Sequence, residues 1–148
     1  MNSKYYTTNK LKKHINNVYS KLRRFAEIDG IYRPLNIDFA NEMPRGMEGF
    51  YCYTDTEGYH YRYVERGIVQ NHEITQNLFE VTYYAIKPCI FSMAVQYERK
   101  YRIINQDSRR IMFKKELQLF DLIGEDYRQR AEFEINEILK EYPFQDDL

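Results

Sequence analysis

The sequence predicts an α+β fold in which a small antiparallel sheet packs against N-terminal and C-terminal helices. β-favouring runs with alternating side chains gather between residues 50 and 74, whereas apolar residues at helical spacing dominate before and after that stretch. Strands that follow one another without intervening helices favour antiparallel pairing. The 148 residues are an ordinary length for one domain, so we expect a single domain over residues 1–148.

The first helix is predicted from an apolar stripe whose members follow one another at steps of four, three, four and three residues. The stripe consists of Leu11, Ile15, Val18, Leu22 and Phe25. Thr7 or Thr8 can cap the start of this helix. Asp29-Gly30 predicts its end, because glycine tolerates the positive φ of a residue that follows a helix.

The sheet is predicted from the middle of the chain. Residues 31–49 are interrupted by prolines and glycines, which indicates a loop with a short edge strand near residues 35–39. Two β-favouring runs around a turn at residues 55–58 then predict a hairpin over about residues 50–65. A further strand is expected near residues 68–74, after a second turn that contains glycine.

Helical spacing returns in the second half of the chain. An interior proline removes a backbone donor and costs about 3 kcal/mol, so Pro88 should divide the first of these segments into two helices. Asp107 can cap the next helix and Gly124 can end it, and Pro143 stops the last one. The expected helices lie at residues 76–86, 88–101, 108–124 and 127–142.

Basic and acidic residues balance at 22 each, which argues against a dedicated nucleic-acid binder. The charge is nevertheless uneven. Residues 1–24 hold seven basic and no acidic residues, whereas residues 116–148 hold three basic and ten acidic ones. We interpret this alternation as pairing between segments of the chain, and an acidic surface for a basic partner is the alternative.

Signatures of the commoner enzyme sites are absent, because the sequence has no glycine-rich phosphate loop, no HExxH and no GxSxG. Cys52 and Cys89 are expected to be buried free thiols, since they form no CxxC pair. The histidines His14, His60 and His72 lack the spacing of a zinc site. We therefore expect no catalytic residue, no metal and no cofactor.

The N-terminus has no apolar core of the kind that signal peptides carry. The most apolar stretch, from Ala85 to Val95, is interrupted by Lys87 and Pro88 and is shorter than the roughly 18 residues that cross a bilayer. We therefore expect a cytoplasmic protein with no membrane partner.

Charged residues concentrate within thirteen residues at the junction of two predicted helices. This charged corner consists of Glu98, Arg99, Arg102, Asp107, Arg109 and Arg110. In the structural interpretation, its two carboxylates accept bidentate hydrogen bonds from Arg102, Arg109 or Arg110. In the alternative, a hydrolase, Glu98 or Asp107 acts as a base and the arginines clamp a phosphate or carboxylate. The sequence offers no residues for the other half of such a site, so we favour the structural interpretation.

The predicted hairpin carries five tyrosines in alternating positions, namely Tyr51, Tyr53, Tyr59, Tyr61 and Tyr63. Tyr51 and Tyr53 share one face of their strand, and Tyr59, Tyr61 and Tyr63 share one face of the next. We interpret them as tyrosines of an amphipathic sheet that cover helices and keep their hydroxyls in water. The alternative is a stacking platform for bases, which would make the chain a small nucleic-acid-binding regulatory protein. That protein would also use the basic residues Lys10, Lys12, Lys13, Lys21, Arg23 and Arg24.

The block over residues 97–113, YERKYRIINQDSRRIMF, resembles the signature of a numbered family of bacterial immunity proteins from polymorphic toxin systems. Glu65–Gly67 after a strand and Phe91–Ala94 on a helix fit the same pattern, so the resemblance spans roughly residues 59–142. Ile104 stands where the family pattern has a proline.

The resemblance implies a non-enzymatic protein that binds and neutralises the toxic C-terminal domain of a secreted effector. It also implies a monomer that forms a one-to-one complex with this toxin domain. A shared fold must accommodate diverse partners, so we expect the charged corner to be scaffold. An acidic inhibitor is attracted to the basic channel of a nuclease toxin. The candidate surfaces are the hairpin tip, with Asp55, Glu57, Tyr59 and Tyr61, and the terminal acids Glu132, Glu134, Glu137, Glu141, Asp146 and Asp147.

Overall fold

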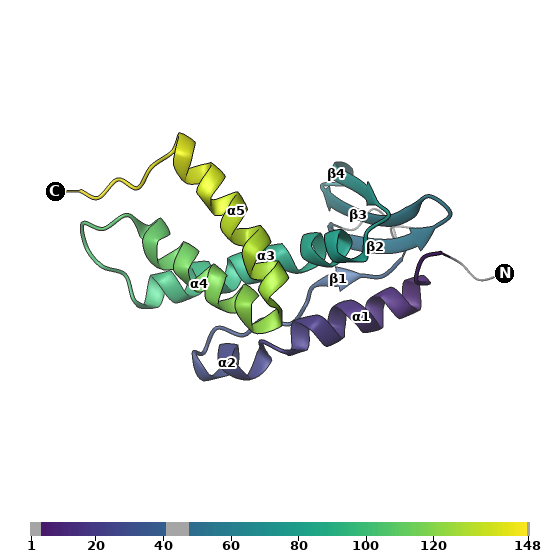
Figure 1. Cartoon of the computed structure of the whole chain (residues 1–148), viewed down its shortest axis with the longest axis horizontal. Coiled ribbons are helices and arrows are strands. Elements are labelled where there is room, and N and C mark those ends of the chain that lie inside the picture. The colour runs from purple at the N-terminus through teal and green to yellow at the C-terminus, as the bar shows by residue number, and fades with distance from the viewer. Residues whose placement is uncertain (1–3, 41–47, 148) are drawn as a thin grey trace. The chain divides into compact units, whose positions relative to one another are not determined.

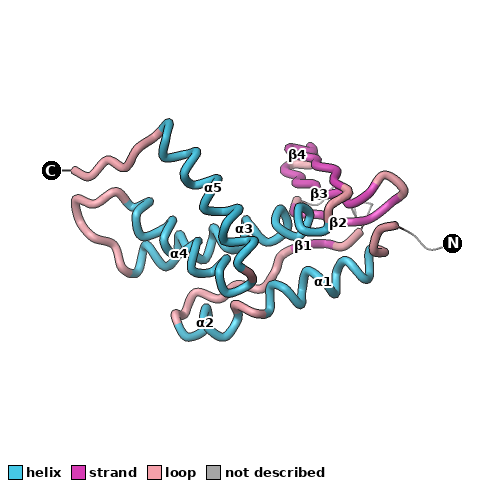
Figure 2. The backbone as a smooth tube through the Cα atoms, viewed as in Figure 1, coloured by secondary structure: helices cyan, strands magenta, loops and turns pink. Residues whose placement is uncertain are grey.

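The computed structural model describes residues 4–40 and 48–147, and their helices and strands confirm the predicted α+β class (Figure 1, Figure 2). The helices are α1 (Thr8–Ser20), α2 (Arg23–Ile28), α3 (Leu78–Lys100), α4 (Ser108–Ile123) and α5 (Glu125–Glu141). The strands are β1 (Ile37–Asp38), β2 (Gly49–Asp55), β3 (Gly58–Glu65) and β4 (Ile68–Thr75).

The chain divides into two compact units. The first unit comprises Met1–Val18 and Pro34–Pro88, and therefore contains the sheet. The second comprises Tyr19–Arg33 and Cys89–Leu148, and therefore contains α2, α4 and α5. The single domain expected over residues 1–148 stays a prediction.

The sheet of the first unit has the strand order β1-β2-β3-β4. The predicted hairpin is present, because β2 and β3 pair antiparallel around the turn at Asp55–Gly58, and β4 continues the antiparallel order. The expected edge strand is only two residues long and pairs parallel with β2, so the sheet is mixed. The chain must cross back between two parallel strands. The predicted loop that would do so lies partly at residues 41–47, outside the described residues.

One face of the hairpin packs on the N-terminal segment and on α3. Tyr59 is buried, and its hydroxyl accepts a hydrogen bond from the Tyr6 amide at 2.8 Å. Tyr61 is also buried, and its ring stacks on Tyr84 of α3 with a centroid distance of 6.1 Å. On the opposite face, Val64 is fully buried. Of the five tyrosines that an RNA-binding platform would need, Tyr51, Tyr53, Tyr59 and Tyr61 are buried and Tyr63 is half-buried.

Helix α3 corrects the prediction of two helices, because it runs through Pro88 without a break. The missing hydrogen bond at a proline is offset here by burial on both sides of it, where Ile86 and Ile90 have no exposed surface. By length and composition alone, α3 could cross a membrane, although the core helix of a soluble protein meets the same test. In α3, 44% of the relevant stretch is buried within the protein.

The N-terminal segment forms two helices where one was predicted. Leu22 donates its amide to the Tyr19 carbonyl at 3.2 Å, a tighter turn than the α-helical one, and this turn separates α1 from α2. Four of the five stripe residues are buried as predicted, whereas Phe25 is exposed. The expected end at Asp29-Gly30 is confirmed, and Gly30 has a φ of +69°.

The second unit contains a part-buried ion pair that joins distant parts of the sequence. The Lys115 ammonium of α4 is buried, bonds the Asp29 carboxylate at the end of α2, and lies 4.2 Å from the centroid of the Tyr97 ring. In the same unit, the Tyr19 hydroxyl donates to the Arg33 carbonyl. The Lys115 contacts therefore tie the end of α2 to α4 and to Tyr97 of α3.

Neither Cys52 nor Cys89 forms a disulfide. Cys52 is buried as predicted, and burial raises the pKa of its thiol to about 12. Cys89 is only half-buried, which corrects the expectation for this residue. Part of the Cys89 side chain therefore faces solvent.

Candidate functional site

The turn between β2 and β3 carries the two acidic residues that the sequence proposed for partner binding. Asp55 and Glu57 are exposed, and Asp55 Oδ1 accepts a hydrogen bond from the Glu57 amide at 2.8 Å. The same oxygen lies 2.8 Å from His60 Nε2. Desolvation opposes the ionised form of Asp55, but these hydrogen bonds outweigh it and hold the pKa of Asp55 below its usual value.

A pair of histidines connects this turn to β4. His60 is buried, its ring stacks on Tyr53 at a centroid distance of 4.3 Å, and its Nδ1 lies 2.9 Å from His72 Nε2 on β4. Desolvation, followed by the positive charge of Arg62, lowers the pKa of His72. The polar chain from Asp55 through His60 to His72 therefore spans three neighbouring strand segments.

Asp55, Glu57 and His60 also place three possible metal-ligand atoms within 4.8 Å of one another. The sequence analysis missed this grouping, because it looked for regular spacing among histidines and cysteines. Exposed acidic groups often gather in this way without a metal, and the hydrogen bonds of Asp55 to His60 and Glu57 account for its position. We therefore assign these residues a role in fixing the turn.

The two tyrosines proposed as partner anchors lie inside the first unit. Tyr59 is 3% exposed and Tyr61 is 6% exposed, so a partner could reach them only after a rearrangement of the hairpin. Aromatic anchors of interfaces are normally accessible before binding. Asp55 and Glu57 remain accessible, and their contact with a partner stays a prediction.

The charged corner lies in the second unit, and its first pair closes the end of α3. Glu98 is buried, whereas the Arg102 side chain is 61% exposed. Arg102 Nη2 donates to Glu98 Oε1 at 2.7 Å, and Arg102 Nε donates to the same oxygen at 3.0 Å. The carboxylate raises the pKa of the Arg102 guanidinium. A buried carboxylate is thus neutralised by an arginine four residues later in the chain.

The second pair caps α4. The Asp107 carboxylate accepts a hydrogen bond from the Arg109 amide at 3.0 Å, which is the N-cap that the sequence predicted. The Arg109 guanidinium bonds the same carboxylate, with Nη2 at 2.8 Å from Oδ2, and the Gln145 amide donates to Oδ2 at 2.9 Å. These bonds, with that of the Arg109 side chain first among them, hold the pKa of Asp107 well below its usual range.

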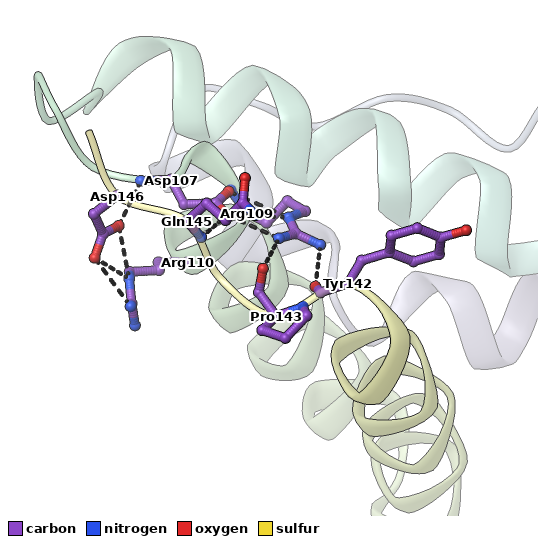
Figure 3. A network of polar contacts seen from close by, with 7 residues as sticks. All are labelled: Asp107, Arg109, Arg110, Tyr142, Pro143, Gln145 and Asp146. Atoms are coloured by element: carbon purple, nitrogen blue, oxygen red, sulfur yellow. Dashed lines mark hydrogen bonds and ion pairs between the residues drawn. The ribbon is translucent and has the colours of Figure 1, made fainter.

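The C-terminal tail docks on this cap, as Figure 3 shows. Arg109 Nη1 donates to the Tyr142 carbonyl at 2.8 Å, and Nη2 donates to the Pro143 carbonyl at 2.9 Å. Asp146 accepts from the Asp107 amide at 2.7 Å and pairs with Arg110 at 3.0 Å. We call this set of contacts the tail strap. The Arg109 side chain therefore binds both Asp107 and the tail, whereas the Arg110 side chain pairs with Asp146 of the tail.

The sequence analysis missed the tail strap and instead grouped Asp146 with acids of the last helix. Asp146 lies beyond the end of α5 and is engaged by Arg110. Two of the strap's acceptors are backbone carbonyls, of Tyr142 and Pro143, whose position no side-chain pattern reveals. The signal that could have found the strap is an acidic tail after a helix-ending proline, opposite two adjacent arginines.

Replacing Asp107 with alanine is expected to lower the free energy of unfolding by about 1–2 kcal/mol, because the helix cap and the Gln145 contact are lost together. Folding lowers the pKa of Asp107, so its contribution is present above about pH 4 and is lost as the pH falls toward the folded value. Urea unfolding at pH 7 and pH 3 measures both effects. Asp147→Ala, an exposed neighbour, is the matched control and should be neutral. Equal losses for the two variants would contradict the strap's role.

The sequence model of a family described as Immunity protein 63 matches residues 55–137, from the turn between β2 and β3 into α5. No curated protein and no solved structure matches the chain. The matched segment contains both the hairpin turn and the charged corner, and it covers more than half of the chain. The chain therefore belongs to the Immunity protein 63 family.

Proposed function

We propose that this protein binds and neutralises a cognate toxin domain, the C-terminal part of a secreted effector in a polymorphic toxin system. The family match over residues 55–137 is the observation that supports the proposal. The family implies an immunity function against a toxin, and hence a protein partner. Contact-dependent inhibition is the setting we propose, with the immunity protein acting in the cytoplasm of the cell that it protects.

The geometry of the chain fits binding better than catalysis. Glu98 and Asp107, the two carboxylates that could have served as a base, are engaged by Arg102 and Arg109. A general base must be free to take a proton from a bound substrate. The charged corner therefore supports the fold, and the protein acts by occupying the toxin's surface as a monomer in a one-to-one complex.

Isothermal titration against the C-terminal domain of the large secreted protein encoded beside the gene tests this function. We expect a one-to-one complex with a Kd near the nanomolar range, which corresponds to about −12 kcal/mol. Co-expression should also restore growth to cells that produce the toxin domain. A toxin domain from an unrelated effector is the control. Neither heat nor protection with the neighbouring domain would refute the proposal for that pair.

A further inference from the structure

The sheet of the first unit has two very different edges. On one side, β1 is only two residues long, and short edge strands are a common protection against unwanted pairing. On the other side, β4 forms the edge (Figure 1). It is eight residues long, and seven of these residues are exposed. Within the described chain, no further strand pairs with this second edge.

Strand β4 lacks most of the features that block edge pairing. Its sequence, IVQNHEIT, has no lysine, arginine or proline. One register shift interrupts its pairing with β3 near Val69, but from Asn71 to Thr75 the pairing is regular. In an edge strand, every second residue turns its backbone N–H and C=O away from the sheet. The segment Asn71–Thr75 therefore offers a regular template for another strand.

Two apolar side chains of β4 lie beside buried residues of β3. Ile74 lies opposite the buried His60, and Val69 lies opposite the buried Val64. Ile74 and Val69 are themselves 45% and 37% exposed. In each of these two pairs the β3 residue is buried and the β4 residue is exposed, so a strand added beside β4 would bury more apolar surface.

Charge indicates the chemistry of the strand that fits here. Residues 48–77 hold five acidic and two basic residues. Glu73 lies in the middle of the regular segment, and the turn with Asp55 and Glu57 is at the same end of β4, because Gln76 Nε2 donates to the Glu57 carbonyl at 3.0 Å. A partner strand with basic side chains would complement this edge.

A second copy of the chain fits the same edge poorly. Antiparallel pairing of two β4 strands centred on the regular segment would place Glu73 opposite Glu73 of the other copy. Like charges directly opposite each other destabilise a sheet. The charge of the edge thus favours a different, basic partner.

We propose that a basic strand of the toxin domain adds to β4 and extends the sheet. This inference rests on the proposed function and names the surface that carries it out. Backbone hydrogen bonds along Asn71–Thr75 supply affinity, and contacts to Ile74 and Glu73 supply selectivity. The hairpin turn, with Asp55 and Glu57, flanks the added strand.

Proline substitutions at neighbouring positions test the role of the backbone. Glu73→Pro and Ile74→Pro remove N–H groups that point to opposite edges of β4, so one disturbs pairing with β3 and the other disturbs only the free edge. Glu73→Ala and Ile74→Ala are the matched controls for the lost side chains. The proline variant that disturbs only the free edge should keep the thermal midpoint of its alanine control. It should bind the toxin domain encoded beside the gene with a Kd at least about tenfold higher than that of the control.

The outcomes separate the edge from the function. Equal binding by that proline variant and its alanine control overturns the edge proposal while the function stands. Failure of the wild-type protein to bind or protect overturns both. If both proline variants unfold, amide exchange of the wild-type complex decides, since exchange at alternate residues of β4 should slow on toxin binding. Unchanged amide exchange of β4 on toxin binding would overturn the assignment to a toxin strand. So would a dimer of the wild-type protein that is dissociated by the proline variant of the free edge.

Discussion

Replacing Arg102 with alanine is expected to lower the thermal midpoint at pH 7 by roughly 5–10 °C. The substitution leaves the buried Glu98 carboxylate without the guanidinium that bonds it through two nitrogen atoms. An uncompensated buried charge costs far more than an exposed ion pair contributes. Thermal unfolding at pH 7 measures the loss.

Two further variants sharpen the interpretation of Arg102→Ala. Arg99→Ala removes an exposed arginine from the last turn of α3, next to Glu98, and should leave the midpoint within about 2 °C of wild type. Adding Glu98→Gln to Arg102→Ala should recover part of the loss, because a neutral amide is cheaper to bury than a charge. A midpoint for Arg102→Ala that matches that of Arg99→Ala would show that the Glu98–Arg102 pair contributes little.

Replacing Gly58 with alanine is expected to lower the free energy of unfolding by about 3 kcal/mol. Gly58 has a φ of +132°, and a Cβ atom there would lie 2.7 Å from the backbone carbonyl oxygen of Thr75. That oxygen belongs to β4, so the clash cannot be relieved by rotating a side chain. Either the turn or the end of β4 must move.

Gly67→Ala is the matched control for Gly58→Ala. Gly67 also has a positive φ, +73°, but a Cβ there would meet no atom within 4 Å. It should cost only the backbone strain, about 1 kcal/mol. Urea unfolding of the two variants isolates the effect of the clash. Losses of equal size would mean that the close approach to Thr75 can relax freely.

The parts of the fold that the sequence predicted correctly depend on local signals. The hairpin follows from alternating residues around a turn with Gly58, and the limits of α4 follow from Asp107 and Gly124. The features that differ depend on residues distant in sequence. Burial of Ile86 and Ile90 keeps α3 continuous through Pro88. The parallel pairing of β1 with β2 depends on the assembled sheet and not on the residues of β1 alone. Propensity at one position does not report such burial.

The same distinction holds for the candidate site. Glu98 with Arg102 and Asp107 with Arg109 are neighbours in sequence, so their pairing could be anticipated from spacing. The partners of Arg110 and Lys115 lie 36 and 86 residues away, and no local pattern indicated them. Tyr59 and Tyr61 show the limit of residue type as a guide, since the side chains that favour interfaces also fill interiors.

Through the tail strap, the last residues of the chain offset positive charge at the start of α4. Arg109 and Arg110 lie in the first turn of α4, where the helix dipole already favours negative charge. Shortening the chain after Tyr142 would remove Asp146 and the Pro143 carbonyl and leave the Arg110 guanidinium without its carboxylate beside a helix N-terminus, while Arg109 would keep Asp107. Such a terminus attracts phosphate and sulfate. A protein shortened after Tyr142 would therefore bind polyanions through a site that the tail occupies in the full chain. Binding studies should use a protein that retains the tail.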